Sequence, residues 1–144
     1  MKFKARILVT GLLLVAGAAF AADATDPTVK AWQELMDANG GAVKTLGGMA
    51  GDKMPFDAAA AEAAKAALVA SSAEIEAKFK TMATDPASKA SPDIWTNWDD
   101  FVAKGNALSA AAAALDVTSL ETLQAGMAGV GGACKDCHMK YKLQ

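Results

Sequence analysis

Residues 118–142 read TSLETLQAGMAGVGGACKDCHMKYK, and this stretch decides how the chain folds. Apolar residues and both cysteines recur along it at alternating steps of three and four, which is the spacing of one face of an α-helix. The positions on this face are Leu120, Leu123, Met127, Val130, Cys134, Cys137 and Tyr141. The pattern predicts a helix over about 118–142 that turns two thiols toward the core of the protein.

The two cysteines form one C-x-x-C-H motif with the histidine that follows them, and the chain has no other cysteine or histidine. C-x-x-C-H is the attachment signature of c-type haem. The two thiols add to the vinyl groups of the macrocycle, and the histidine ligates the iron from the same side. The motif therefore predicts one covalently attached haem held by Cys134 and Cys137, with His138 as its proximal ligand.

Other uses of this motif fit the chain less well. A structural zinc site needs four Cys or His ligands, and only three exist here. A thioredoxin-like redox pair is expected beside a βαβ pattern, which the sequence lacks. A disulfide between Cys134 and Cys137 would close so small a loop that it would constrain the chain little.

Three further segments show helical periodicity, at about 27–50, 57–82 and 92–115. Each begins at or just after a residue type that commonly caps helices, namely Asp26, Asp57 and Ser91. Glycines and prolines mark the connections between them. Four amphipathic helices with short connections predict an all-α fold, an antiparallel up-down-up-down four-helix bundle with one covalent haem.

Two details of these helices are also predicted. Glycines within the first helix predict a kink or fraying after Met36, since each costs roughly 1 kcal/mol relative to alanine; they are Gly40, Gly41, Gly47 and Gly48. The spacing in the second helix predicts an inner face that ends on Met82.

The first residues of the chain have the pattern of a secretory signal peptide. Lys2, Lys4 and Arg6 precede an apolar run over 7–20, and an A-x-A cleavage site ends at Ala21. The run is shorter than the roughly 20 apolar residues of a membrane span, although an uncleaved anchor is the alternative. We therefore expect cleavage of residues 1–21, a mature helical domain over 22–144, and a periplasmic location without stable membrane insertion.

The charge balance bears on possible partners. The chain carries 14 Lys and Arg against 16 Asp and Glu. Loss of the three basic residues of the leader leaves a net charge of about −5 before any cofactor is counted. The mature chain has no basic cluster that could follow a phosphate backbone, so nucleic acid is not an expected partner.

The sixth ligand of the iron decides what the haem can do, and methionine is a common sixth ligand in electron-carrying c-type haems. In an antiparallel bundle, the end of the last helix lies level with residues 29–36 of the first. Met36 is therefore the expected metal ligand, and Met82, at the end of the second helix, is the rival. Ordinary core packing is the alternative role for Met36.

Polar groups near this level could meet the haem propionates. Trp95, at the start of the third helix, has an indole N–H that needs a partner when buried. Gln33 and Lys142 could also reach a propionate. A plain core role for Trp95, and solvated side chains for Gln33 and Lys142, are the alternatives.

These features together resemble the cytochrome c-prime family, the class II c-type cytochromes. The residues from Cys134 to His138 match its haem motif, and those from Pro92 to Trp95 resemble its P-x-I-W entry to the third helix. Tyr141 and Lys142 resemble its aromatic and basic ending. The resemblance covers essentially the whole mature chain.

The resemblance has implications for the first helix. Gln33 matches a glutamine of the family, whereas Trp32 stands where many members carry an arginine beside the haem edge. Gas-binding members have a leucine or another non-ligating residue where this chain has Met36, and their iron is five-coordinate. A low-spin branch has methionine there, so the resemblance implies His138/Met36 ligation.

The resemblance implies an electron carrier and not an enzyme. The carrier is expected to exchange electrons with a partner protein of unknown identity. A five-coordinate protein that binds NO or CO is the alternative. A peroxidase-like enzyme is a third possibility, but no second histidine exists to serve as a distal acid or base. The resemblance also allows a homodimer formed through the first two helices.

Overall fold

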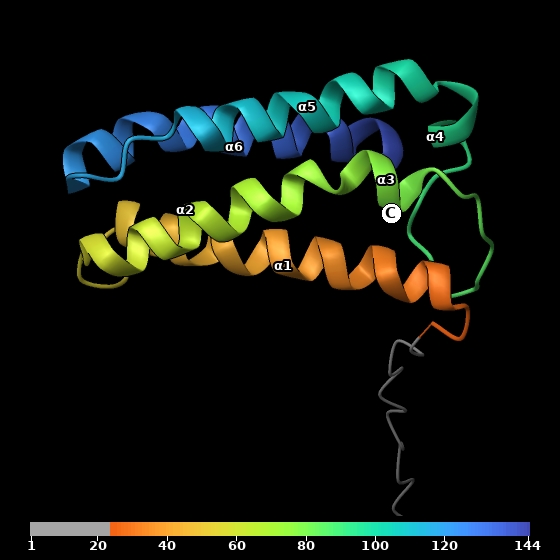
Figure 1. Cartoon of the computed structure of the whole chain (residues 1–144), viewed down its shortest axis with the longest axis horizontal. Helices are drawn as coiled ribbons and strands as arrows, with labels where there is room; N and C mark the ends of the chain where they lie inside the picture. The colour runs from red at the N-terminus through yellow and green to blue at the C-terminus, as the bar shows by residue number, and fades with distance from the viewer. Residues whose placement is uncertain (1–23) are drawn as a thin grey trace, which may run out of the picture.

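The computed structural model describes residues 24–144, so the predicted signal peptide at 1–21 lies outside the described residues. The long helices run alternately up and down and pack side by side (Figure 1). The elements are α1 Pro27–Ala50, α2 Ala58–Ala73, α3 Ile75–Phe79, α4 Asp93–Thr96, α5 Trp98–Ala114 and α6 Leu120–Tyr141. The predicted all-α four-helix bundle is confirmed.

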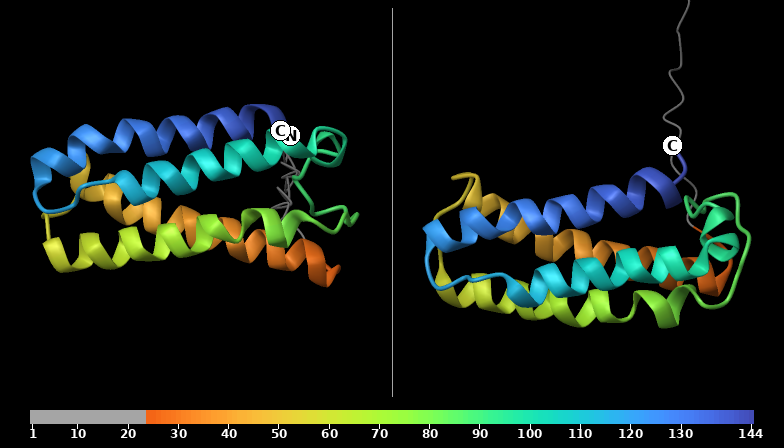
Figure 2. Two further views of the ribbon diagram at one scale, coloured as in Figure 1. Left: turned by 45° about the horizontal axis from the view of Figure 1, so that its top comes forward. Right: turned by 90° about the horizontal axis from the view of Figure 1, so that it is seen from above.

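Neighbours in the chain are also neighbours in space. α1 packs on α2, α2 on α5, α5 on α6, and α6 closes the ring against α1. The two further views also show the helices lying lengthwise beside one another (Figure 2). Within residues 24–144, no helix is both long enough and apolar enough to cross a bilayer.

Helix α1 is unbroken over Pro27–Ala50, so the fraying predicted after Met36 is wrong. Asp26 caps its start, because Oδ1 accepts from the backbone N–H groups of Thr28 and Val29 at 2.7 and 3.1 Å. Its buried stripe is Val29, Trp32, Leu35, Asn39, Ala42, Leu46 and Met49. Packing of this stripe along the whole length of the helix outweighs the low helix propensity of its glycines.

The predicted second helix is shorter than expected and is divided. A turn at Glu74 separates α2 from α3, and helical structure ends at Phe79. Met82 is 60% exposed and lies outside the bundle core, so its predicted place on the inner face is wrong. The physical reason is that the chain after Phe79 has to leave the helix direction to cross the end of the bundle.

The predicted third helix is divided as well, into α4 and α5 at Asn97. Asn97 has φ −125° and ψ 45°, and its side-chain amide donates to the carbonyl of Asp93 at 3.1 Å. Short amide side chains compete in this way with the backbone hydrogen bonds of a helix. The last helix is shorter than predicted by two residues at its start and one at its end.

One end of the bundle is closed by the segment between α3 and α4, which we call the 80–92 connection. It runs from the end of α3 to the start of α1 and returns to α4 (Figure 1). Thr25, just before α1, and the last turn of α6 form hydrogen bonds with it there. We call this the haem end, because α6 carries the C-x-x-C-H motif near it.

Candidate haem site

A cavity of about 500 Å³ lies inside the haem end. Its wall is mostly apolar and draws on five helices and the 80–92 connection. The lining residues are Val29, Trp32, Gln33, Met36, Asp37, Asn39, Gly40 and Val43 of α1, Ile75 and Phe79 of α3, Ser88, Lys89 and Ala90 of the connection, Ile94 of α4, Phe101, Lys104, Gly105 and Leu108 of α5, Ala133, Cys134, Cys137, His138 and Tyr141 of α6, and Lys142. Its size falls within the range of cofactor sites, about 300–1,000 Å³.

The C-x-x-C-H motif forms one side of this cavity. Cys134 and Cys137 are half-buried on α6, and both sulfurs are free thiols. Burial raises the pKa of each thiol above its ordinary value. Desolvation, reinforced by the positive charge of Lys142, lowers the pKa of His138. A lowered pKa favours the neutral imidazole, which is the form that binds metal.

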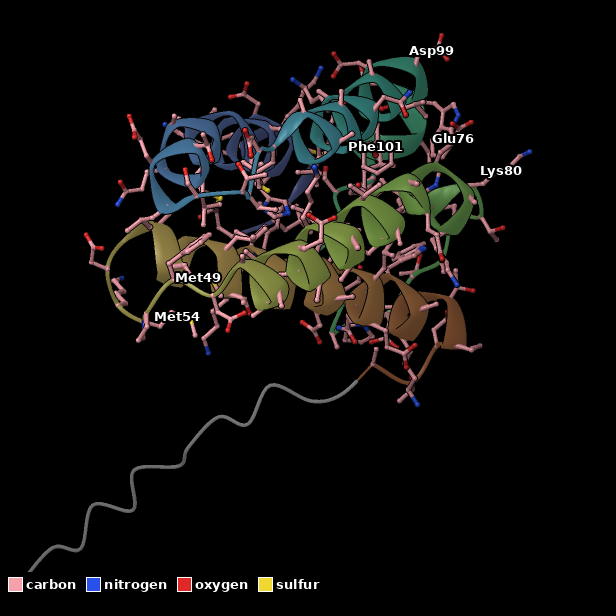
Figure 3. All side chains as sticks on the ribbon, turned by 60° about the vertical axis from the view of Figure 1, so that its left-hand side comes forward. Met49, Met54, Glu76, Lys80, Asp99 and Phe101 are labelled. Atoms are coloured by element: carbon pink, nitrogen blue, oxygen red, sulfur yellow. The ribbon has the colours of Figure 1, made fainter. Side chains whose placement is uncertain are left out.

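Among the methionines of residues 24–144, only Met36 lines the cavity. It is half-buried at the edge of the core stripe of α1, next to the buried Leu35. Met82 is outside the cavity wall. Met49 and Met54 lie at the opposite end of the bundle, where α1 leads into α2 (Figure 3). The structure therefore brings Met36 to the motif and leaves its rival outside.

The two predicted haem-edge residues have different places. Gln33 lines the cavity, and its Nε2 donates to the carbonyl of Ala87 in the 80–92 connection at 3.2 Å. Trp95 is not part of the cavity wall, and its indole N–H donates to the carbonyl of Phe79 at 2.8 Å. Its ring lies 5.3 Å from that of Trp32. Trp95 therefore contacts two residues of the cavity wall, Trp32 and Phe79, without lining the cavity, and its N–H already has a partner.

Trp32 is a part of the site that we did not predict from the residues alone. Its ring is buried and stacks on Phe79, with the centroids 5.0 Å apart and the planes at 10°. Its indole N–H donates to the carbonyl of Lys78 at 2.8 Å. The signal that could have found it was its place one helical turn before Met36.

A second unpredicted feature joins α5 to α6 next to the motif. Tyr141 lines the cavity, and its hydroxyl donates to Asp100 Oδ2 at 2.6 Å. Lys140 also donates to this oxygen, at 2.9 Å. These two donors, Tyr141 first, hold the pKa of Asp100 below its ordinary value. The network fixes the end of α6 one turn beyond His138.

The residues present fit a covalently attached haem. The α6 wall supplies two thiols and an imidazole, and the α1 wall supplies a methionine. Aromatic side chains also line the cavity, namely Trp32, Phe79, Phe101 and Tyr141. Gly40 also lines the cavity, and a Cβ added there would meet no heavy atom within 4 Å. Space for a flat apolar group and ligands for an iron atom therefore occur together.

Comparisons with known proteins agree with this site. The sequence model described as cytochrome C' matches residues 27–142. A cytochrome c-556 of Agrobacterium fabrum is 34% identical over 135 residues, which cover 91% of this chain and 88% of that protein. The solved structure of a cytochrome c' from Rhodobacter Spheriodes is 31% identical, with a TM-score of 0.76, over 81% of this chain and 95% of that chain.

A further solved structure is that of a ferrous cytochrome c prime variant from Alcaligenes xylosoxidans with bound NO. It is 28% identical to this chain, with a TM-score of 0.72. The match covers 81% of this chain and 94% of that chain. The similarity therefore covers about four fifths of this chain in both cases, and the family match over residues 27–142 includes the C-x-x-C-H motif.

Proposed function

Because this chain belongs to the cytochrome c' family, we propose that it is an electron carrier whose iron is ligated by His138 and Met36. Proteins of this family carry covalently attached c-type haem, and the cofactor of this chain is one haem c. The observation that carries the proposed ligation is the place of Met36. It is the one methionine of residues 24–144 in the wall of the cavity that also holds His138.

The roles of the residues follow from where they lie. Cys134 and Cys137 fix the cofactor to α6, and His138 presents a neutral imidazole from the same helix. Met36 supplies a thioether from α1. When bound, the haem supplies a reversible one-electron change at its iron. A methionine ligand and an apolar wall that excludes water both raise the reduction potential of such a centre.

Full coordination also argues against an enzyme. With both axial positions taken by side chains, no open position remains for a substrate. The chain has one histidine, which the proposed ligation uses, so none remains to act as an acid or base beside the iron. We therefore propose a carrier that exchanges electrons with another protein and transforms no substrate.

A five-coordinate protein that binds NO or CO is the second candidate, and one observation favours it. The cavity continues along α1 beyond Met36 to Asn39, Gly40 and Val43. A diatomic ligand would find room there if Met36 packed against the wall instead of binding the iron. The similar Alcaligenes xylosoxidans protein was solved with NO bound.

The setting of this carrier is also part of the proposal. The signal peptide predicted at 1–21 implies export to the periplasm, where the mature domain works as a mobile carrier. Its redox partner docks over the open side of the cavity, through a small interface of the kind that weak redox encounters use. A homodimer formed through α1 and α2 remains a prediction. The molecular mass of the protein in solution would test whether it is a dimer.

The test is the optical and EPR spectrum of the purified ferric holoprotein. We expect low-spin, six-coordinate iron, and we expect Met36→Leu to convert it to high spin. Met82→Leu is the matched control and should leave the spectrum unchanged. High-spin iron in the wild type, or a Met36→Leu protein that stays low-spin, would contradict the proposed ligation.

A further inference from the structure

One buried carboxylate holds the 80–92 connection to the start of α1. Asp85 is 8% exposed. Its Oδ2 accepts from the backbone N–H of Thr25 at 2.7 Å, from the Thr25 hydroxyl at 2.9 Å and from the N–H of Asp26 at 2.9 Å. Its Oδ1 accepts from the N–H of Ala87 at 2.8 Å. Hydrogen bonds to a charged acceptor are among the strongest in proteins, so this is a firm clamp.

The far side of the same connection is tied to the end of α6. The N–H of Ser91 donates to the carbonyl of Tyr141 at 2.9 Å, and the N–H of Leu143 donates to the carbonyl of Lys89 at 2.8 Å. Ala90 and Lys142 form an isolated antiparallel bridge between these bonds. The connection therefore spans the gap between the first helix and the last.

The two helices that it joins carry the two proposed iron ligands. Met36 lies on α1, and His138 lies on α6 one turn before Tyr141. Between its anchors, the connection contributes Ser88, Lys89 and Ala90 to the cavity wall. Within residues 24–144, the Gln33 side chain adds a fourth hydrogen bond between this segment and the start of the chain around α1, because its Nε2 donates to the carbonyl of Ala87 at 3.2 Å.

We propose that Asp85 is a positioning residue for the iron site. By clamping the 80–92 connection to the start of α1, it holds α1 and α6 at the separation that lets Met36 and His138 reach the same iron. Asp85 itself lines no part of the cavity. The proposal rests on the proposed His138/Met36 ligation for its main readout.

The chain offers a matched control at the opposite end of the bundle. Asp116, in the turn between α5 and α6, accepts from the N–H and the hydroxyl of Thr118 at 2.9 and 2.7 Å. Asp85 makes the same pair of bonds to Thr25. Asp85→Asn and Asp116→Asn both weaken this pair of charge-assisted hydrogen bonds. Asp85→Asn also affects the bonds from the N–H groups of Asp26 and Ala87, and only Asp85 lies at the haem end.

The experiment measures the rate at which saturating imidazole replaces Met36 on the ferric iron of the holoprotein. Loss of one charge-assisted hydrogen bond should favour the state in which Met36 is detached from the iron by about tenfold. We expect Asp85→Asn to raise the rate by about that factor and Asp116→Asn to leave it within about twofold. Thr25→Val, which removes only the hydroxyl bond, should give a smaller rise. Equal rates in Asp85→Asn and Asp116→Asn would overturn the proposal.

Two outcomes need a second readout. If Asp85→Asn yields no folded holoprotein, Thr25→Val decides, and a rate no higher than that of Asp116→Asn overturns the proposal. If the wild type is high-spin, the His138/Met36 ligation fails, but the clamp is still tested by the reduction potential, because residues 88–90 line the cavity with either coordination. A shift in both Asp85→Asn and Thr25→Val supports the clamp, because Thr25→Val leaves the charge of Asp85 in place. A Thr25→Val potential equal to that of the wild type overturns it.

Discussion

The hydroxyl of Tyr141 donates to Asp100 at 2.6 Å, and this bond joins the last turn of α6 to the first turn of α5. Tyr141 is 3% exposed, and its ring meets that of Phe101 edge to face, 5.4 Å between centroids. The haem-bearing helix is thus held on both sides just beyond His138. Asp100 and Phe101 hold it on α5, and the 80–92 connection holds it on the side of α1.

Tyr141→Phe removes the hydroxyl and keeps the ring. We expect the melting temperature of the holoprotein to fall by about 4 °C, because one hydrogen bond to a charged acceptor is lost. Thermal unfolding followed by circular dichroism measures this change. Thr96→Val, which removes an exposed hydroxyl bonded to the carbonyl of Asp93, is the control. An equal fall in the melting temperature of both variants would show that the Tyr141 bond stabilises the protein no more than an exposed hydroxyl bond does.

Trp32 and Trp95 form a matched pair, because their indole N–H groups donate to the successive carbonyls of Lys78 and Phe79, each at 2.8 Å. Replacing either by phenylalanine should lower the melting temperature to a similar extent. Only Trp32→Phe should shift the reduction potential, since only Trp32 lines the cavity. A shift in Trp95→Phe as large as that in Trp32→Phe would restore Trp95 to the cofactor contacts predicted from the sequence.

Gly40 and Gly41 test the extent of the cavity. Both lie within α1, and a Cβ added at either would meet nothing within 4 Å. Only Gly40 lines the cavity. Gly40→Leu should therefore lower the haem content of the purified protein, whereas Gly41→Leu should keep it. Absorbance per protein chain gives the comparison, and equal haem content in the two variants would place the bound group elsewhere.

Much of this fold could be predicted from the sequence, because helix caps and periodicity act locally. Asp26 marks the start of α1, and the alternating steps through Cys134 and Cys137 put both thiols on a wall of the bundle. The glycines of α1 misled the prediction, since burial of one stripe along the helix decides its continuity. That stripe is a property of the assembled bundle.

Where the structure departs from the sequence-based expectations for the site, the cause is a contact between segments distant in sequence. Met82 follows the helical spacing of the apolar residues before it. However, the helix ends at Phe79, and the chain then brings Asp85 to Thr25, 60 residues away in sequence. Trp95 has the right level for the cofactor, but the carbonyl of Phe79 takes its N–H. Neither partner can be identified from spacing along the chain.

Acid should weaken the clamp made by Asp85. The backbone N–H groups of Asp26, Ala87 and Thr25 hold the pKa of Asp85 well below its ordinary value of about 3.9. The unfolded chain therefore takes up this proton first, so the stabilisation is complete above about pH 4 and is lost as the pH falls further. Asp26 is the other carboxylate where the 80–92 connection meets the start of α1. It accepts hydrogen bonds from the backbone N–H groups of Thr28 and Val29.

The pH dependence of the melting temperature measures this loss. Below about pH 4, the decline should be shallower in Asp85→Asn than in the wild type, because an amide takes up no proton there. The two proteins should differ most above about pH 4, where the wild type has its full clamp. Parallel declines at lower pH would show that Asp85 has the same pKa in the folded and unfolded chain.

In the proposed ligation, Met36 supplies the second ligand to the iron that His138 holds. The most direct measurement is the proton NMR spectrum of the reduced holoprotein with methyl-labelled methionine. A methyl group bound beside the iron lies over the macrocycle and is shifted strongly upfield. We predict one such methyl resonance, absent from Met36→Leu and retained in Met82→Leu. A wild-type spectrum without a shifted methyl, or one that keeps it in Met36→Leu, would contradict this ligation.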